Sequence, residues 1–537
     1  MPTVADASIL LALKNIVHFG DTDVFPLPLE RHWFEEDEPG VLAVLRNFDV
    51  RFDETVGSYP VTFEKVLTGV GYNGFRAATQ IDPLWNAYLL ALVIELAPHI
   101  EAARVPVERN TVFSYRYLPD LESGGLFSKT EGWRSFQERA LALASDAKFV
   151  LATDISDFYQ RIYHHRLENA LQLAAPNKEA AKRVQVILFK LAGGTSYGLP
   201  IGGNAARLLA ELLLNRVDRL LLASSVTFCR FVDDYLIFAK TREEAQRALV
   251  TLSDSLMRNE GLTLSRNKSR LMSASEFRRA SPLAELEHSD SAEEQRAKRF
   301  LRIRWNYDPY SPTAPEDYHK LVDEVAGFDV LSMLATEFRK ARVDESLVRQ
   351  LVRSIVFLDP PLRDGAALSL VENLQTLYPV FPTVARVLRK ILPDVSPEAK
   401  ARILLELRGL LRSGSHIMMV PSNALYAVRL LANDPSEEVD VLYTQLYQAP
   451  TTDSLLRRDI IYSMTKRGAH YWLSDLLKRN AQLASWERRA LLAASFSLGD
   501  EGKHWRAQRE AELSEIERAY RRWLGIKNNG APWDIPI

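Results

Sequence analysis

The chain has 537 residues, 47% of them hydrophobic and 25% charged, which is a globular composition long enough for more than one packed core. The formal net charge of -2 excludes a uniformly basic nucleic-acid coat, and the single cysteine, Cys229, excludes an intramolecular disulfide and a cysteine-based zinc site. The first apolar run has no basic leader, and residues 84–94, the most apolar long stretch, are too short to cross a bilayer. We therefore expect no membrane span and a cytoplasmic protein.

The first half of the chain mixes two periodicities. Apolar runs of strand length, FVLATD and TFCRFV, alternate with helical stretches such as ARLLAELLLNRVDRLLL. This pattern predicts an α+β domain, which we place at residues 1–285.

An aspartate, Asp154, ends the first of these strand-like runs. The following residues, ISDFYQRIYHH, predict that the chain turns from the strand into a helix. Carboxylates at the carboxyl end of a strand are where α/β folds usually gather their sites. The alternative is that Asp154 caps the helix, which is a common role for aspartate.

A glycine-rich turn, YGLPIGGN at residues 197–204, precedes a long helix with Leu208, Leu209, Leu212 and Leu213 on its buried face. Such a turn lets the backbone approach a ligand closely. The alternative is an ordinary glycine-rich helix entry.

Two adjacent carboxylates, Asp233 and Asp234, lie between strand-like runs in FCRFVDDYLIF, residues 228–238. The pattern predicts a β-hairpin with both aspartates at its turn. Neighbouring carboxylates in a partly enclosed site repel each other unless water or a cation offsets the repulsion, and a hard cation such as Mg²⁺ does so well. The alternative is a polar turn in solvent.

The segment after this hairpin predicts a helix that ends near Gly261. Leu-Thr-Leu at residues 262–264 then predicts a strand before Lys268. Lys268 is a candidate for contacting a phosphate or protonating a leaving pyrophosphate; the alternative is a solvated surface lysine.

The second half of the chain is predicted to be all-α. Residues 281–295 are polar and acidic and predict a linker, so we place a helical domain at residues 296–537. Two capping sequences, Ser396-Pro397-Glu398 and Asp434-Pro435-Ser436-Glu437, open amphipathic helices. Several such helices in series, without a constant period, predict HEAT-like hairpins.

A basic stretch begins this second domain. We expect it either to follow the phosphates of a nucleic-acid strand, with the tryptophan stacking on a base, or to be a solvated helix face. Its residues are Arg296, Lys298, Arg299, Arg302, Arg304 and Trp305.

In chain order, the segments of the first half resemble motifs A to D of reverse transcriptases. Asp154 matches the motif A aspartate, LPIGG the motif B turn, FVDD the motif C carboxylates and Lys268 the motif D lysine. The resemblance covers roughly half the chain. It implies a fingers-and-palm fold and a nucleotidyltransferase in which Asp154, Asp233, Asp234 and the Ile155 carbonyl hold two Mg²⁺ ions, with Mn²⁺ as an alternative.

The resemblance also implies contacts with the nucleotide. Tyr159 falls at the steric-gate position that selects deoxynucleotides, and Pro200 and Gly202 belong to the motif B turn. Gly74-Phe75-Arg76 resembles the fingers segment whose arginine holds the triphosphate, and Tyr115-Arg116 resembles a later fingers motif.

Three further segments, HFGDTDVFPLPLE, GFRAATQIDPLWNA and VFSYRY, together with the helical second half, resemble the prophage-borne abortive-infection polymerases. These are bacterial phage-exclusion proteins related to reverse transcriptases. The resemblance implies antiphage defence, template-independent polymerisation of dNTPs, a single-stranded DNA product attached to a protein tyrosine, and a homo-oligomer, either trimer or hexamer. Ile201 stands where reverse transcriptases usually carry Gln, which agrees with this narrower family.

Two other interpretations stay open. One is a conventional RNA-templated, retron-like reverse transcriptase. The other is a non-catalytic scaffold that binds nucleic acid or protein.

Overall fold

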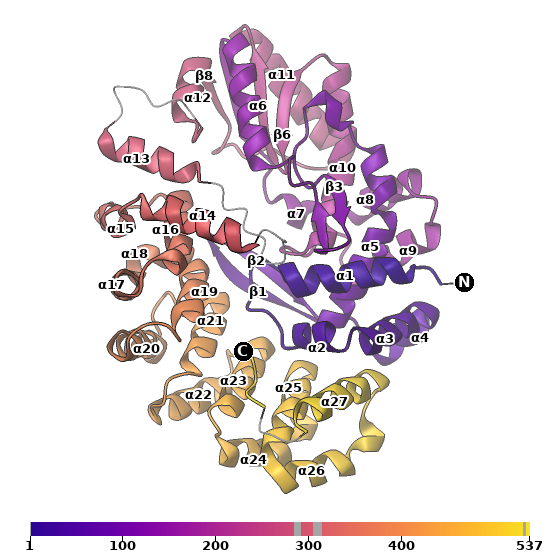
Figure 1. Cartoon of the computed structure of the whole chain (residues 1–537). Helices are drawn as coiled ribbons and strands as arrows, with labels where there is room; N and C mark the ends of the chain where they lie inside the picture. Colours follow the sequence, from indigo (N-terminus) through magenta and orange to yellow (C-terminus); the bar gives the residue numbers. More distant parts are fainter. Residues whose placement is uncertain (1, 284–290, 304–313, 530–532) are drawn as a thin grey trace. The chain divides into compact units, whose positions relative to one another are not determined.

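The computed structural model describes residues 2–283, 291–303, 314–529 and 533–537 (Figure 1). The chain forms two compact units, each built from several segments. The first consists of Met1–Asp23, Leu42–Phe63 and Ile81–Lys298, and the second of Val24–Val41, Glu64–Gln80 and Arg299–Ile537. The sequence pattern predicts two continuous domains, 1–285 and 296–537, whereas the second unit also contains two segments from the N-terminal part of the chain.

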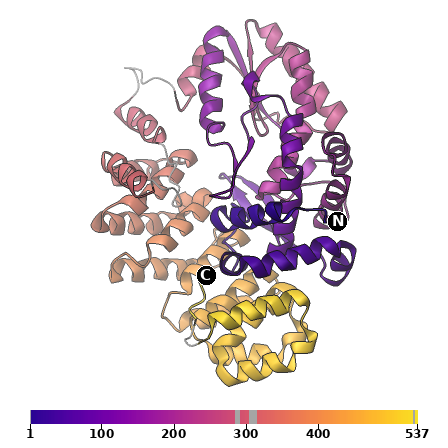
Figure 2. The same ribbon diagram turned by 45° about the vertical axis from the view of Figure 1, so that its right-hand side comes forward.

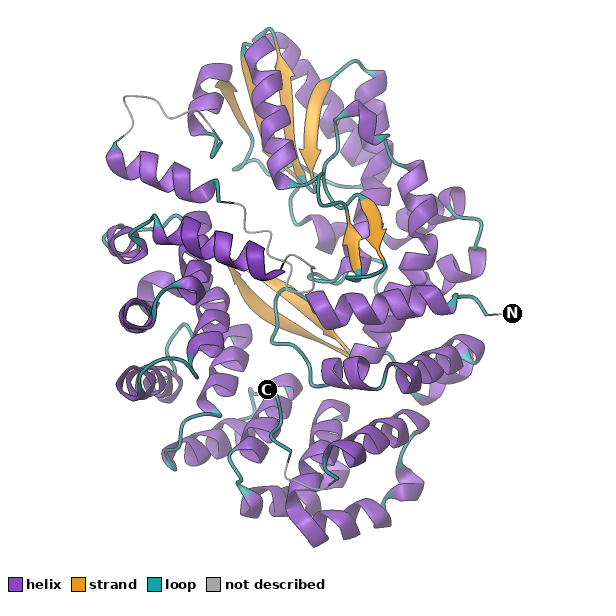
Figure 3. Ribbon diagram, viewed as in Figure 1, coloured by secondary structure: helices purple, strands orange, loops and turns teal. Residues whose placement is uncertain are grey.

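The first unit is built around a four-stranded antiparallel sheet in the order β6-β7-β5-β8 (Figure 3). Its strands are β5 (Phe149–Asp154), β6 (Thr227–Phe231), β7 (Asp234–Ala239) and β8 (Arg270–Ser273). Successive side chains of a strand point to opposite faces, so each strand contributes to two different cores. The strands predicted around FVLATD and on both sides of the adjacent aspartates are present.

Two different sets of helices cover the faces of this sheet. On one face, Phe136 of α6 (Trp133–Asp146) and Phe277 of α12 (Ala274–Ala280) pack with Cys229 and Phe238 in one hydrophobic cluster. On the other face, the Tyr235 hydroxyl donates to Asp218 of α10 (Asn204–Ala223) at 3.2 Å. The sheet is therefore covered on both faces, and the site carboxylates emerge at one end of its strands.

A long apolar helix, α5 (Pro83–Ala103), forms a second core in this unit. Asp82 caps its first turn by accepting from the Leu84 and Trp85 N–H groups, and proline occupies its first position. Within the described residues, this helix alone is long and apolar enough to cross a membrane by length and composition, and 83% of its apolar 18-residue stretch is buried inside the protein. It is longer than the run of residues 84–94 that the sequence pattern marks as apolar.

The remaining helices and strands up to residue 301 belong to the first unit, or span a position in the sequence where the chain passes from one unit to the other. They are α1 (Asp6–Phe19), α3 (Glu38–Val50), α4 (Phe52–Ser58), β3 (Tyr117–Asp120), β4 (Gly125–Phe127), α7 (Phe158–Arg161), α8 (His164–Ala174), α9 (Lys178–Leu191), α11 (Arg242–Ser255), a π-helix (Leu256–Glu260) and α13 (Ala292–Leu301).

The second unit combines a β-hairpin with a series of helices. The hairpin pairs β1 (Phe63–Val70) with β2 (Gly74–Ile81). The helices are α2 (Glu30–Glu36), α14 (Ala314–Ala326), α15 (Val330–Phe338), α16 (Glu345–Ser354), α17 (Pro360–Glu372), α18 (Leu374–Leu377), α19 (Phe381–Ile391), α20 (Pro397–Arg412), α21 (Pro421–Leu431), α22 (Glu438–Gln448), α23 (Ser454–Lys466), α24 (His470–Lys478), α25 (Ser485–Ala494), α26 (Gly499–Gln508) and α27 (Glu515–Lys527).

Five of these helices, α16, α19, α21, α23 and α25, contact one another in succession. Figure 2 shows the later helices of the chain in colours that run from orange to yellow. The predicted fold class, α+β followed by a helical region, is confirmed. The assignment of the helices to HEAT-like repeats stays a prediction.

The two predicted helix starts differ in outcome. Ser396 caps α20 as expected, because its hydroxyl accepts from the Ala399 N–H at 3.2 Å. The second prediction is wrong by a few residues, because α22 begins at Glu438. Asp434 accepts instead from the Ser436 N–H at 2.9 Å, which forms a separate turn before the helix.

Candidate active site

Strand pairing brings the three predicted carboxylates to one place. Asp154, the last residue of β5, is the register partner of Asp234, the first residue of β7. Asp233 lies in the two-residue turn between β6 and β7, and its carbonyl accepts from the Ile155 N–H at 3.3 Å. Asp154 and Asp233 are 79 positions apart, so only the antiparallel pairing of β5 with β7 makes them neighbours.

The segment that carries Lys268 does not have the predicted secondary structure. The prediction of a strand at residues 262–264 is wrong, because this segment makes a single bridge, between Leu264 and Ile155, and strand β8 begins only at Arg270. Backbone bonds still tie the segment to the site, since the Ser265 N–H donates to the Asp154 carbonyl at 2.7 Å. As a result, Lys268 Nζ lies 2.7 Å from Asp154 Oδ2.

The carboxylates strongly influence one another. Burial, followed by the charges of Asp154 and Asp234, raises the pKa of Asp233 to about 7. Although the Asp234 side chain reaches solvent, the protein packed around the turn and the nearby Asp154 raise its pKa to about 6. The hydrogen bond to Asp154 raises the pKa of Lys268, so this lysine is a stable cation beside the cluster.

These donors fit a hard divalent cation in chemical type. Carboxylate and carbonyl oxygens are the ligands that Mg²⁺ and Mn²⁺ prefer. Burial, followed by repulsion between the carboxylates, raises the pKa of Asp233 and Asp234, and a bound cation would offset that repulsion. In the part of the chain that the structure describes, no group of three or more His, Cys, Asp or Glu side chains is already arranged to hold a metal ion. The Lys268 ammonium group itself forms an ion pair with Asp154.

Tyr159 connects the Asp154 loop to the glycine-rich turn. It lies on α7, and its carbonyl accepts from the Leu199 N–H at 2.8 Å. Burial, followed by the neighbouring Tyr115, raises the pKa of its hydroxyl well above the usual value, and the charge of Asp233 also contributes. Tyr159 therefore follows Asp154 by five residues and is bonded to the glycine-rich turn, whereas its role as a steric gate stays a prediction.

The glycine-rich turn packs against the N-terminal segment of the same unit. Gly202 has φ +114°, and a Cβ there would overlap Thr22 Oγ1 and lie 3.3 Å from Asp23 Oδ1, so both backbone angle and space require glycine. Arg207, in the first turn of α10, binds Asp23 at 2.8 Å. Pro200 is buried in this turn. Sequence reasoning did not identify Asp23 or Arg207 as site residues. The one indication in the sequence is that Asp23 lies within HFGDTDVFPLPLE and Arg207 lies three residues after the glycine-rich turn.

The arginines of the resembling fingers segments lie in different surroundings. Arg76 is exposed on β2 and belongs to the second unit, so its contact with a triphosphate stays a prediction. Arg116 is buried in the first unit, where it donates to Glu101 at 2.9 Å and to the Val105 carbonyl at 2.8 Å. In the basic stretch, Arg296, Lys298 and Arg299 lie on α13, while Arg304 and Trp305 lie outside the described residues.

Sequence reasoning also missed a buried group of charges beneath the turn. Arg230 on β6, two residues before Val232, is fully buried and binds Glu211 and Asp218 of α10. The available signal was a charged residue within a strand-like apolar run, together with two acids seven residues apart on an otherwise apolar helix face.

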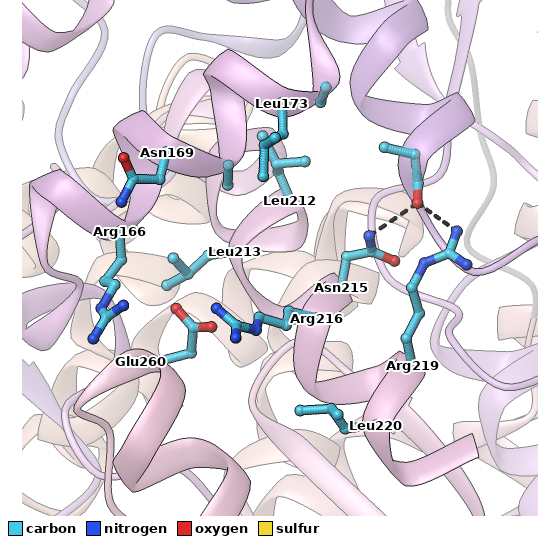
Figure 4. Close-up of a pocket in the computed structure, with 13 residues that line it drawn as sticks. Arg166, Asn169, Leu173, Leu212, Leu213, Asn215, Arg216, Arg219, Leu220 and Glu260 are labelled. Atoms are coloured by element: carbon cyan, nitrogen blue, oxygen red, sulfur yellow. Dashed lines mark hydrogen bonds between the residues drawn. The ribbon is translucent and has the colours of Figure 1, made fainter. Parts of the chain in front are cut away.

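A separate cavity of about 460 Å³ opens between α8 and α10 (Figure 4). Arg166, Arg216 and Glu260 line it, and Asn215 and Arg219 donate to the Ala103 carbonyl at 2.9 and 2.7 Å at its edge. None of the predicted site residues lines this cavity, so it is distinct from the carboxylate cluster.

Comparison with known proteins agrees with the geometry of the first unit. Residues 108–301 match the family described as reverse transcriptase (RNA-dependent DNA polymerase). No curated protein matches the chain.

Similar solved structures include three of telomerase. The one from Candida albicans in complex with a TWJ fragment of telomeric RNA has 10% identity and a TM-score of 0.29, with 76% of this chain and 69% of that chain covered. Apo telomerase from Candida tropicalis has 11% identity and a TM-score of 0.30, with 80% and 78% covered. Its complex with a TWJ fragment has 9% identity and a TM-score of 0.28, with 75% and 68% covered.

The family match spans Asp154, Asp233 and Asp234, and residues 108–301 therefore form a domain of the reverse-transcriptase type.

Proposed function

We propose that this protein is a metal-dependent DNA polymerase of the reverse-transcriptase type that joins dNTPs into a single-stranded DNA product. The observation that carries this proposal is the pairing of Asp154 with Asp234, with Asp233 in the adjoining turn, inside the domain that matches reverse transcriptases. Acidic side chains that raise one another's pKa in a partly enclosed site are characteristic of functional sites.

The three aspartates and the Ile155 carbonyl would hold two Mg²⁺ ions, with Mn²⁺ as the alternative. When bound, these ions neutralise charge on the triphosphate and lower the pKa of the attacking hydroxyl. Lys268 holds a proton at Nζ, close enough to the cluster to serve the leaving pyrophosphate.

The remaining predicted residues would select and orient the nucleotide. Tyr159 would crowd the 2′ position of the sugar, since its helix α7 follows Asp154 and Ile155 closely in the chain. The turn with Pro200 and Gly202 would present its backbone to the nucleotide, as the resemblance to motif B implies. Arg76 would hold the triphosphate.

The biological setting that we propose is antiphage defence by abortive infection in the bacterial cytoplasm. We propose that synthesis uses no template, starts from a tyrosine of the protein, and takes place in a homo-oligomer, either trimer or hexamer. The resemblance of HFGDTDVFPLPLE, GFRAATQIDPLWNA and VFSYRY, together with the helical second half, to abortive-infection polymerases supports this, and so does Ile201 in place of Gln.

A second candidate is an RNA-templated reverse transcriptase. The description of the matching family as an RNA-dependent DNA polymerase favours it. The two candidates share the carboxylate site and differ in whether synthesis requires a template.

The first test compares the purified protein with Asp154→Asn and with Asp233→Asn/Asp234→Asn in an assay with labelled dNTPs and Mg²⁺. We expect each variant to lose at least ~10²-fold in rate, because each removes charge from the site that stabilises the transition state. Asp254→Asn, which changes an exposed aspartate on α11, is the matched control and should keep the wild-type rate. Wild-type incorporation in the Asp233→Asn/Asp234→Asn protein would refute the site.

The same assay, run with and without RNA and DNA templates and resolved on a denaturing gel, separates the candidates. Label that stays on the polypeptide without template is the outcome expected for tyrosine priming. Free labelled DNA that forms only with an RNA template would establish the second candidate. Binding of Mg²⁺ and dNTP in calorimetry without turnover under any condition would indicate a scaffold.

A further inference from the structure

The turn that presents the paired aspartates contains a backbone conformation that its residue type disfavours. Val232 has φ +56°, in the left-handed region, and the residue is 9% exposed. Five non-glycine residues among those described have a positive φ, and Val232 is the β-branched member of this set. A β-branched side chain in this region is a genuine outlier and persists only where the surroundings impose it.

Two side chains hold the backbone of Val232 from both sides of the residue. Its N–H donates to Ser114 Oγ at 2.9 Å, and its carbonyl accepts from Arg230 Nη1 at 2.7 Å. Both backbone polar groups of one buried residue are therefore fixed by side chains rather than by the strand ladder. The next residue is Asp233, so the direction in which this carboxylate leaves the turn depends on these two bonds.

The two side chains are themselves held by a buried, charge-balanced network. Arg230 donates to Asp218 at 2.6 and 2.9 Å and to Glu211 at 2.9 and 3.2 Å. Ser114 Oγ donates to Glu211 at 2.5 Å, and Arg104 binds Glu211 at 2.7 Å. Two cations, Arg104 and Arg230, face two carboxylates, Glu211 and Asp218, and all four are at most 2% exposed.

Such a network is costly as a source of stability alone. Buried ion pairs lose most of their attraction to desolvation, and hydrophobic residues of the same size often stabilise a core as well or better. This network is bonded to the residue with positive φ that precedes the carboxylate pair. It can therefore also fix the backbone conformation of the turn and the direction of the Asp233 side chain.

We propose that Ser114 and Arg230, oriented by Glu211 and Asp218, are positioning residues that hold Val232 in its left-handed conformation and so direct Asp233 toward Asp154. This inference rests on the proposed function of the aspartates. It extends the site to residues of α10, β6 and the segment before β3, which act through the backbone of Val232.

A double-mutant cycle tests the proposal through the backbone angle. Ser114→Ala removes one of the two bonds and should lower kcat by roughly ten- to a hundredfold with little change in the KM for dNTP, because misplacing a catalytic group affects the transition state. Val232→Gly should stay active, since glycine adopts a positive φ readily. In the Val232→Gly background, Ser114→Ala should lower kcat by less than about threefold.

Val232→Ala is the matched control, because it shortens the same side chain and keeps a Cβ that disfavours positive φ. It should leave the full effect of Ser114→Ala on kcat. The unfolding midpoint should fall by a similar amount on Ser114→Ala in all three backgrounds, which separates positioning from general stability. Ser114→Thr, which keeps the hydroxyl, should restore kcat.

Equal loss of kcat on Ser114→Ala in the valine and glycine backgrounds would overturn the proposal, and so would equal rescue by alanine and glycine at position 232. Mn²⁺ affinity, measured by calorimetry without nucleotide, gives a second readout on the same proteins and should follow the same pattern as kcat. A wild-type protein that incorporates no dNTP would refute the proposed function, while the Mn²⁺ cycle would still decide whether the network positions the carboxylates.

Discussion

At the scale of single residues, a buried titratable group makes the stability of the protein depend on pH. Glu260 ends the π-helix after α11, is 5% exposed and lines the cavity between α8 and α10. Burial raises its pKa from 4.5 to about 7, although Arg216 and Arg166 oppose the shift. The folded protein therefore prefers this side chain protonated and neutral.

The expected consequence is a loss of stability as pH rises. The folded-state pKa of Glu260 lies above its unfolded value, so its contribution is present below pH 4.5 and is lost between pH 4.5 and about 7. Glu260→Gln stays neutral and should be more stable than the wild type at pH 8 by up to about 3 kcal/mol, with a much smaller difference at pH 5. Denaturant unfolding at the two pH values measures this, with Glu243→Gln on the exposed face of α11 as the control. A difference that does not change with pH would contradict the assignment.

At the scale of elements, capping and strand pairing determine where side chains lie. Asp82 is 2% exposed and begins α5, the central helix of the first unit. Besides its two backbone bonds, it accepts from the Tyr59 hydroxyl at 2.8 Å. One side chain therefore fixes the start of the helix and also binds a half-buried hydroxyl.

Removal of this cap should destabilise the protein more than removal of an ordinary one. Asp82→Ala should cost about 2 kcal/mol, because it leaves helix N–H groups and the Tyr59 hydroxyl without this acceptor. Asp82→Asn keeps an acceptor oxygen and should cost less. Thr241→Ala, which removes the exposed cap of α11, should cost about 1 kcal/mol. Thermal unfolding followed by circular dichroism compares the three variants, and equal losses for Asp82→Ala and Thr241→Ala would contradict this ranking.

At the scale of the whole molecule, the second unit joins residues that are hundreds of positions apart. Glu30 on α2 forms a buried ion pair with Arg489 on α25 at 2.8 Å. Trp33 packs against Tyr520 with ring centroids 5.3 Å apart, and Trp523 Nε1 donates to Glu36 at 2.8 Å. The early segment Val24–Val41 therefore shares a core with the C-terminal helices.

Breaking this ion pair from one side should be costly. Glu30→Leu should destabilise the protein by about 3–5 kcal/mol, because it removes the carboxylate that lies 2.8 Å from the buried Arg489 charge and offsets it. The double variant Glu30→Leu/Arg489→Leu should lose clearly less than Glu30→Leu alone, since neither charge remains buried. Equilibrium unfolding monitored by tryptophan fluorescence measures the difference. Additive losses in the double variant would show that the two residues do not act as a pair.

The local features of the site could be predicted from the sequence. Short apolar runs that end in Asp154 or surround Asp233 and Asp234 predict strands and a hairpin, because strand periodicity and turn chemistry depend on neighbouring residues. The same local reasoning placed a strand at residues 262–264, where the structure has a single bridge. It also divided the chain into continuous domains, because a pattern read along the sequence does not show that residues 24–41 and 64–80 pack with the C-terminal helices.

The sequence by itself determined the identity and order of the acidic residues, the glycine-rich turn and the helical character of the second half, since each follows from residue types at short spacing. Only the tertiary structure decided that Asp154 pairs with Asp234, that Lys268 binds Asp154, and that Arg230 and Ser114 bind the backbone of a Val232 with positive φ. The physical reason is that strand register, buried ion pairs and a positive φ arise from packing between segments far apart in the chain.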